Sequence, residues 1–260
     1  MRLWVAAGGV FFLYVAACAV LVPGLSSARR FSAAAVSVLG IAVVLFLHLL
    51  PHHVLVHEWV FPPILLLLAY WASGLLFVAP MPAIERALWD VDRRLQVDAR
   101  AARLPRPFAE LLELAYLGVY PLIPLSLAIH LLGSPSPDPD WFWSVVLVTD
   151  FVCFGFLPWV QTRPPRAFVR TNPWTSAVRG LNLHVLRRGS IQVNTFPSGH
   201  AAEALAAALL VSDAAGPAVL AVWVSAALVS AGAVLGRYHY AADAFAGWIV
   251  AGLVWYCTPR

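Results

Sequence analysis

The feature that most constrains this chain is a succession of apolar runs, each about as long as the roughly 20 residues that a helix needs to cross a bilayer. With 61% hydrophobic and 12% charged residues, the 260-residue chain has little room for a soluble domain beside these runs. The sequence therefore predicts an all-α, polytopic membrane helix bundle of about eight transmembrane helices. The predicted spans are 3–22, 31–50, 61–79, 109–132, 141–160, 198–214, 217–236 and 241–257.

The basic residues are distributed unevenly over the two predicted sides of the membrane. All 17 are Arg, and if the spans alternate in direction, 15 of them share a side with the connections 23–30, 80–108 and 161–197. The positive-inside rule places this side in the cytoplasm of a multi-pass cell-membrane protein. The bias persists when the Arg residues that a phosphate site would need are set aside.

The stretch 83–104 is too charged to cross a bilayer. Its acidic and basic residues are interspersed with apolar ones such as Leu88, Trp89 and Leu95. This pattern predicts an amphipathic helix lying at the membrane interface. A solvated surface helix is the alternative.

Three polar groups fall on the Arg-rich side, at the ends of predicted spans. Arg-Pro-Pro-Arg at 163–166 follows the fifth span, Pro-Ser-Gly-His at 197–200 opens the sixth, and 237–243 joins the seventh to the eighth. Because the topology brings these span ends to one membrane face, we expect them to meet there. An active site at the membrane surface requires such a meeting of polar groups.

These groups contain the parts of a phosphate-processing site. His239 and Asp243 are four residues apart, so on one helix they would lie within hydrogen-bonding reach. A carboxylate that holds one ring nitrogen leaves the other as a base or nucleophile. Ser198 and Gly199 at a helix start would offer N–H groups and the positive end of the helix dipole to an anion, with His200 beside them.

Further candidates are ionisable residues close to these motifs. Arg163, Arg166 and Arg237 would complete a cationic cradle, since Arg binds phosphate through two parallel hydrogen bonds. Glu203 follows His200 by three residues on one helical face and could orient it. Asp150 lies inside a predicted span, where an interhelical hydrogen bond competes with a role in substrate binding. Loop residues that could contact a headgroup are Asn172, Asn182, His184 and Asn194.

The densest histidine cluster lies on the opposite predicted side. Interfacial histidines are common in membrane proteins, and we expect no metal site there and no cofactor. The expected partners are a lipid phosphate substrate and membrane lipids, with no nucleic acid, and the oligomeric state is left open. The residues of this cluster are His48, His52, His53, His57 and Glu58.

In these motifs the sequence resembles the phosphatidic acid phosphatase type 2 superfamily, which comprises histidine phosphatases and phosphotransferases of lipid phosphates. The second motif of that family is matched in full at 197–200, the third by His239 and Asp243, and the end of the first by Arg163 with Pro164. The resemblance covers about residues 61–257. It implies a six-helix catalytic core in 61–260, preceded by two added transmembrane helices in 1–60.

The resemblance also implies a two-step reaction without a metal. His239 would attack phosphorus and form a phosphohistidine, while Asp243 holds its ring. His200 would protonate the leaving alkoxide and then activate the water or alcohol that resolves the intermediate. The groups expected to hold the phosphate oxygens are Arg163, Arg166, Ser198, Gly199 and Arg237.

The chain departs from the family pattern at three positions. Phe156 replaces a Lys of the first motif, and Gly232 and Ala233 replace the Ser-Arg pair of the third. Arg166 and Arg237 are the candidates to replace the missing cations.

The Pro-Pro-Arg loop and the surrounding sequence look more like the inositol-phosphorylceramide-synthase-like branch of the family. A lipid or polyprenyl phosphate phosphatase is thus the first hypothesis. The alternatives are a phosphotransferase that moves a phospho-headgroup onto a lipid alcohol and a non-catalytic lipid-binding or transport protein with the same fold.

Overall fold

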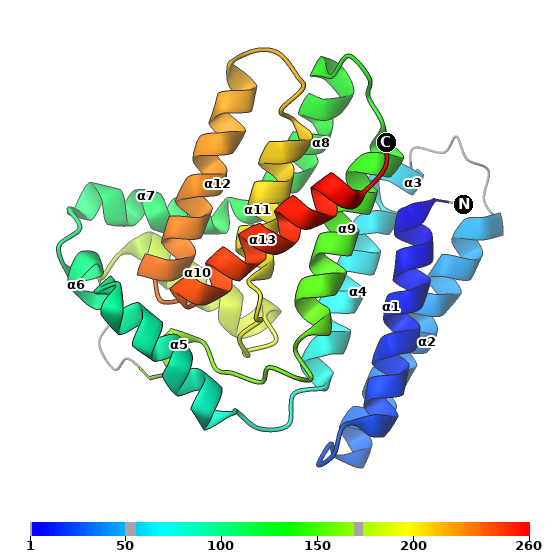
Figure 1. Ribbon diagram of the computed structural model, residues 1–260, viewed down its shortest axis with the longest axis horizontal. Helices are drawn as coiled ribbons and strands as arrows, with labels where there is room; N and C mark the ends of the chain where they lie inside the picture. The colour runs from blue at the N-terminus through cyan, green and yellow to red at the C-terminus, as the bar shows by residue number, and fades with distance from the viewer. Residues whose placement is uncertain (1, 50–55, 169–173) are drawn as a thin grey trace.

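The computed structural model describes residues 2–49, 56–168 and 174–260, and helices are the regular elements throughout these ranges (Figure 1). The predicted all-α class is confirmed. The helices are α1 (Leu3–Leu21), α2 (Ser27–Leu49), α3 (Val56–Trp59), α4 (Phe61–Leu75), α5 (Pro82–Arg94), α6 (Val97–Ala102), α7 (Arg106–Leu117), α8 (Val119–Gly133), α9 (Pro139–Gly155), the 3-10 turn η1 (Pro165–Ala167), α10 (Ala177–Gly189), α11 (Gly199–Leu210), α12 (Pro217–Leu235) and α13 (Ala241–Cys257).

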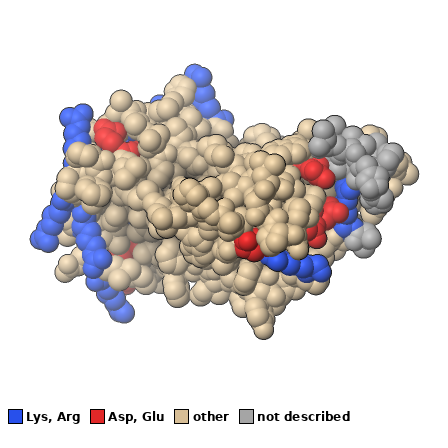
Figure 2. All heavy atoms as spheres, turned by 90° about the horizontal axis from the view of Figure 1, so that it is seen from above, with Lys and Arg blue, Asp and Glu red and all other residues tan. Residues whose placement is uncertain are grey.

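Three of the described helices, α1, α2 and α12, are long and apolar enough to cross a membrane on their own. The helices α4, α11 and α13 are apolar but shorter, so the expected number of eight spans is not confirmed. In the view of Figure 2, the charged side chains form a few separate groups, and most of the visible surface is uncharged. Such a surface is compatible with a membrane protein.

The predicted span 109–132 is wrong as a single straight helix. Its residues form α7 and α8, which are bent by 65° at Gly118 and would make a fourth span only as a pair. Pro121 follows the bend and has no N–H with which to continue the helical ladder across it. The sequence length alone therefore overestimated how far this segment runs in one direction.

The helix α11 lies at the centre of the bundle and packs against α8, α9, α12 and α13 (Figure 1). Its buried surface consists mainly of alanines, whose small side chains let neighbouring helices approach closely. The closest approach is at Gly247 of α13, where a Cβ would lie 2.5 Å from the Ser198 carbonyl oxygen. This contact holds the start of α13 against the start of α11.

The N-terminal pair α1 and α2 forms an outer layer beside this core. The two helices pack closely at Gly40, where a Cβ would come within 2.5 Å of the Phe12 ring. In turn, α1 packs on α9 and α2 packs on α4. The helices α1 and α2 are thus attached along one side of the bundle.

The charged stretch 83–104 forms two helices, α5 and α6, instead of one. They are separated at Gln96, which has a φ of 51°. The helix α5 is amphipathic and turns Glu85, Leu88 and Asp92 inward, toward the region where α13 begins. We call residues 82–102 the strap, because they run across the end of the bundle at which α13 starts (Figure 1).

Candidate active site

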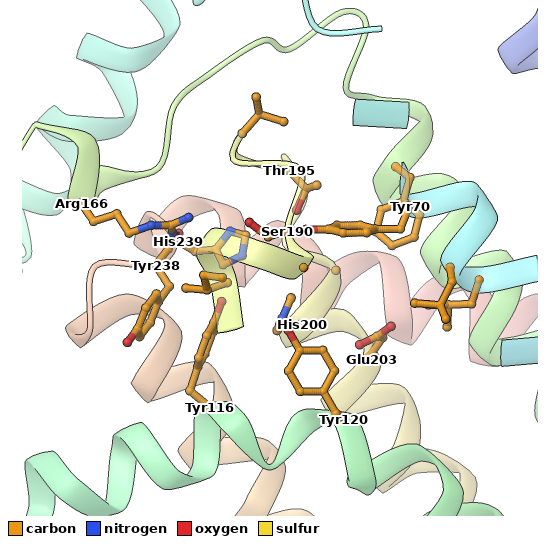
Figure 3. A pocket seen from close by; sticks show the side chains of 17 residues that line it. Tyr70, Tyr116, Tyr120, Arg166, Ser190, Thr195, His200, Glu203, Tyr238 and His239 are labelled. Atoms are coloured by element: carbon orange, nitrogen blue, oxygen red, sulfur yellow. The ribbon is translucent and has the colours of Figure 1, made fainter. Parts of the chain in front are cut away.

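A pocket of about 130 Å³ lies beside the start of α11 and brings together residues that are far apart in the chain. Arg166 comes from the connection after α9, His200 and Glu203 from α11, and His239 from the junction between α12 and α13. Figure 3 shows these side chains directed into one space, with Arg166 pointing toward His239. The other labelled lining residues are Tyr70, Tyr116, Tyr120, Ser190, Thr195 and Tyr238.

His239 lies just before α13 and not on its first turn, as the sequence spacing had suggested. Its backbone N–H donates to the Ala233 carbonyl at 2.9 Å. Its Nδ1 faces Oδ2 of Asp243 at 3.6 Å. This distance is slightly too long for a hydrogen bond. The opposite ring nitrogen, Nε2, is thus the one available to the pocket.

Asp243 is held by more than His239. Its Oδ2 accepts hydrogen bonds from the Tyr240 backbone N–H at 2.9 Å and from Asn194 Nδ2 at 2.8 Å. Asp243 therefore caps α13 and faces the imidazole at the same time. Asn194 was a candidate for headgroup contact, and the structure places it behind the histidine instead.

Burial and the nearby Arg166 guanidinium lower the pKa of His239 to about 3. Both effects disfavour a second positive charge on the ring. The imidazole is consequently neutral at physiological pH, which is the form that can act as a nucleophile.

His200 lies in the first turn of α11, with its ring held between aromatic side chains. Tyr116 stacks on it at a centroid distance of 5.1 Å and an interplanar angle of 6°, and Tyr120 meets it edge-on at 5.9 Å. Its buried Nε2 has no hydrogen-bond partner among the residues that the structure describes. The centroids of the two imidazoles are 5.9 Å apart, so both rings face the same space.

The two residues before His200 have different positions. Ser198 is fully buried and caps α11, since its Oγ accepts from the Ala201 N–H at 3.3 Å and its own N–H donates to the Asp243 carbonyl. Gly199 lines the pocket. A side chain there is not tolerated easily, because a Cβ would lie 3.0 Å from the Phe154 ring.

Arg166 is the predicted cation that the structure brings into the pocket. It is half-buried, and its Nη1 donates to the Tyr238 carbonyl at 3.4 Å. Within the described ranges, no carboxylate pairs with it. Its charge is thus available to an anion.

Arg163 lies outside this pocket, in a separate hollow against the strap. Its Nη2 binds Glu85 Oε2 at 2.9 Å, and its backbone N–H donates to the same carboxylate at 2.8 Å. Burial alone would raise the pKa of Glu85, but the hydrogen bonds from Arg163 outweigh it and lower that pKa. The Arg163 charge is therefore already neutralised.

Arg237 is also outside the pocket and is 1% exposed. Its Nη1 binds Asp92 at 2.8 Å and its Nε binds Asp98 at 2.9 Å. Its guanidinium lies 5.2 Å from the Trp89 ring. The structure thus places Arg237 against the strap, paired with two carboxylates and away from the pocket lining.

The comparison with protein families agrees with these motifs. The family model of the PAP2 superfamily, the phosphatidic acid phosphatase type 2 group, matches residues 86–257. The chain belongs to the PAP2 superfamily. Its members are generally phosphatase-type enzymes. No curated protein and no solved structure matches the chain.

Packing explains why the chain departs from the third PAP2 motif. The slot that is Ser in the family is Gly232 here, and a Cβ at this position would lie 2.6 Å from the Leu112 carbonyl oxygen of α7. The next slot is Ala233, which is fully buried. An Arg side chain at this buried slot would require the surrounding residues to move. Phe156, at the Lys slot of the first motif, is 45% exposed and does not line the pocket.

The sequence reasoning missed a buried network around Glu113 behind the pocket. Glu113 is 1% exposed and was hidden inside an apolar run, although a carboxylate in such a run is itself a signal of a polar partner. Its carboxylate accepts from Arg179 Nη1 at 2.7 Å and from the Tyr238 hydroxyl at 2.6 Å. The further donors are Trp174 Nε1 and Asn182 Nδ2.

We expect Glu113→Ala to lower the free energy of unfolding by about 3–5 kcal/mol, because it removes the ion-pair partner of the buried Arg179. Unfolding in detergent, followed by Trp fluorescence, measures the change. Glu110→Ala is the matched control, since Glu110 pairs only at 3.9 Å with an exposed Arg106. Its expected effect is below about 1 kcal/mol. Equal effects of the two substitutions would contradict the network.

The remaining candidates are placed as follows. Glu203 lines the pocket one turn after His200. Asp150 is fully buried behind α11. Asn172, His52 and His53 lie outside the described residues. Within the described residues, no group of three or more His, Cys, Asp or Glu side chains could hold a metal ion.

Proposed function

We propose that this chain is an integral membrane phosphatase that hydrolyses a lipid or polyprenyl phosphate through a phosphohistidine intermediate. The observation that carries the proposal is the pocket in which His239 and His200 face each other at 5.9 Å, with Arg166 beside them. Membership of the PAP2 superfamily supports the reaction class.

In the first step, Nε2 of His239 attacks phosphorus and the bond from phosphorus to the ester oxygen breaks. His200 enters this step as the imidazolium, which the charge of the bound phosphate stabilises, and becomes neutral when it gives its proton to the leaving alkoxide. Asp243 stabilises the ring charge that develops on His239, through the Nδ1 that faces it. The phosphoryl oxygens bind the Arg166 guanidinium and the backbone N–H at Gly199, near the positive end of α11.

In the second step, His200 takes a proton from a water molecule, which attacks the phosphohistidine. The P–N bond then breaks, and inorganic phosphate and free His239 are released. The fixed orientation of the His200 ring on Tyr116 directs both proton transfers to one place.

Purified protein should release inorganic phosphate from phosphatidate or a polyprenyl phosphate in the presence of EDTA, and vanadate should block the release. A product that forms only when an acceptor alcohol is supplied would contradict hydrolysis in favour of phosphotransfer. Absence of turnover with every lipid phosphate, with or without an acceptor, would favour a binding or transport protein.

We further propose that the pocket opens toward the cytoplasm, because 15 of the 17 Arg residues share its side of the predicted topology. A single cysteine at the exposed Arg187 of α10, placed in a background without the three native cysteines, tests this orientation. It should resist an impermeant thiol reagent in intact cells and react after permeabilisation. Labelling in intact cells would place the site on the outer face.

A further inference from the structure

Glu203 lies where the catalytic pocket meets a second hollow. The second hollow, of about 230 Å³, lies between α4 and α8 and reaches Trp143 of α9. The two hollows share four lining residues, namely Leu66, Leu67, Tyr120 and Glu203. The second hollow thus adjoins the pocket that contains His200.

The second hollow fits a hydrocarbon chain. Apart from Glu203 and Tyr120, its lining is apolar, with Ile123 and Pro124 on one side and Pro63 on the other. Leu67 and Tyr120 are 45% and 52% exposed on the outer surface, so the hollow is open to surrounding lipid. A lipid whose phosphate is at His239 would place its chain here, because the two hollows adjoin at Glu203 and Tyr120.

Glu203 is the exception in this lining. A carboxyl group in apolar surroundings is destabilising unless it has a hydrogen-bond partner. Apart from the neighbouring carboxyl of Asp150, no described residue donates a hydrogen bond to Glu203.

The groups behind and beside Glu203 have polar atoms that no described donor or acceptor outside this carboxyl pair satisfies. Asp150 is fully buried, and neither of its oxygens meets a described donor in good geometry. Trp143, which lines the same hollow and is 3% exposed, has an Nε1 without a described partner. The junction therefore has spare hydrogen-bonding capacity at the place where the first atoms of a lipid chain would lie.

We propose, building on the proposed phosphatase function, that Glu203 accepts a hydrogen bond from a hydroxyl or amide N–H that the lipid carries close to its phosphoester. The order of groups along the site supports this assignment, with the phosphate at His239 and Arg166, the donor at Glu203 and the chain between α4 and α8. Glu203 is then a specificity-determining residue. The substrate class is a lipid phosphate with a polar backbone, as distinct from a polyprenyl phosphate.

The test compares matched substrates of one chain length, namely hexadecyl phosphate, its 2-hydroxy derivative and its 2-acylamino derivative. The wild-type kcat/KM should be about tenfold or more higher for at least one donor-bearing substrate, as expected for a hydrogen bond to a carboxyl group. Comparing the hydroxy and acylamino arms shows which donor is preferred. Equal kcat/KM for all three substrates would overturn the proposal.

Two variants separate recognition from a structural role. In Glu203→Leu the preference for a donor should disappear, whereas in Glu203→Gln, which keeps an acceptor oxygen, part of it should return. A structural defect would lower kcat/KM for all three substrates equally and preserve their ratio. A ratio that is unchanged in Glu203→Leu would therefore contradict the assignment.

A binding measurement keeps this test independent of turnover. Non-hydrolysable hexadecyl phosphonate and its 2-hydroxy derivative are added to wild type and Glu203→Leu, and Tm is measured. The hydroxylated phosphonate should raise the wild-type Tm more, and the variant should lose that difference. If the wild type shows the Tm difference but no turnover, the phosphatase proposal is wrong and recognition of the donor by Glu203 stands. If the wild type turns over substrate but shows no Tm difference, the recognition proposal is wrong and the phosphatase proposal stands.

Discussion

His239→Ala is expected to lower kcat for phosphate release by at least about a thousandfold, because no other described side chain in the pocket replaces the attacking nitrogen. The ring is neutral, its Nδ1 faces Asp243, and its Nε2 is left for phosphorus. Rapid quenching of the wild-type reaction with a labelled lipid phosphate should trap an acid-labile, alkali-stable phosphoprotein. The variant should show none.

His184→Ala is the control for this experiment. His184 is an exposed histidine of α10 that does not line the pocket, and its removal should leave kcat unchanged. A labelled phosphoprotein in His239→Ala, or a rate close to the wild type, would exclude the proposed nucleophile. A labelled phosphoprotein would indicate another attacking side chain, whereas a rate close to the wild type without label would indicate direct attack by water.

Arg166→Ala and Arg163→Ala are expected to differ sharply, although both residues belong to one short motif. Removing Arg166 takes away the unpaired cation of the described pocket and should lower kcat by about 10² to 10³-fold with little change in Tm. Removing Arg163 leaves the buried carboxylate of Glu85 without its ion-pair partner, so the main effect should be a lower Tm.

Comparing the two variants also tests whether Arg163 stays paired with Glu85 during turnover. Parallel measurements of kcat and Tm in the same detergent separate the two kinds of loss. If Arg163→Ala loses kcat as strongly as Arg166→Ala at an unchanged Tm, Arg163 must reach the phosphate during turnover. The pairing with Glu85 would then belong only to the state without substrate.

The all-helical fold and the convergence of the two histidines could be predicted from the sequence, and the roles of the Arg residues could not. A long apolar run indicates directly that a segment is a membrane helix, and polar motifs at the ends of such runs indicate where the chain reverses direction. The partners of Arg163 and Arg237 are carboxylates 78 and 145 residues away in the strap. Nothing local in the sequence indicates that these charges are already matched.

The sequence did not predict the breaks within helical segments or the exact starts of helices. The bend at Gly118 and the break at Gln96 interrupt segments whose composition favours continuous helices. Likewise, the spacing of His239 and Asp243 suggested one helical face, but the structure uses Asp243 to cap a helix that begins at Ala241. Tertiary contacts, including that of Asn194 with Asp243, decided these details.

The strap fixes the position of residues 237–241, the loop that carries His239. Asp92 holds both Arg237 and the Ala241 N–H, one on each side of His239, and Asp98 adds a second contact to Arg237. If the strap lies at the membrane interface, as its amphipathic sequence predicts, His239 is carried at the same height as the strap. Its distance from the phosphates of that leaflet would then stay constant when the bilayer becomes thicker or thinner.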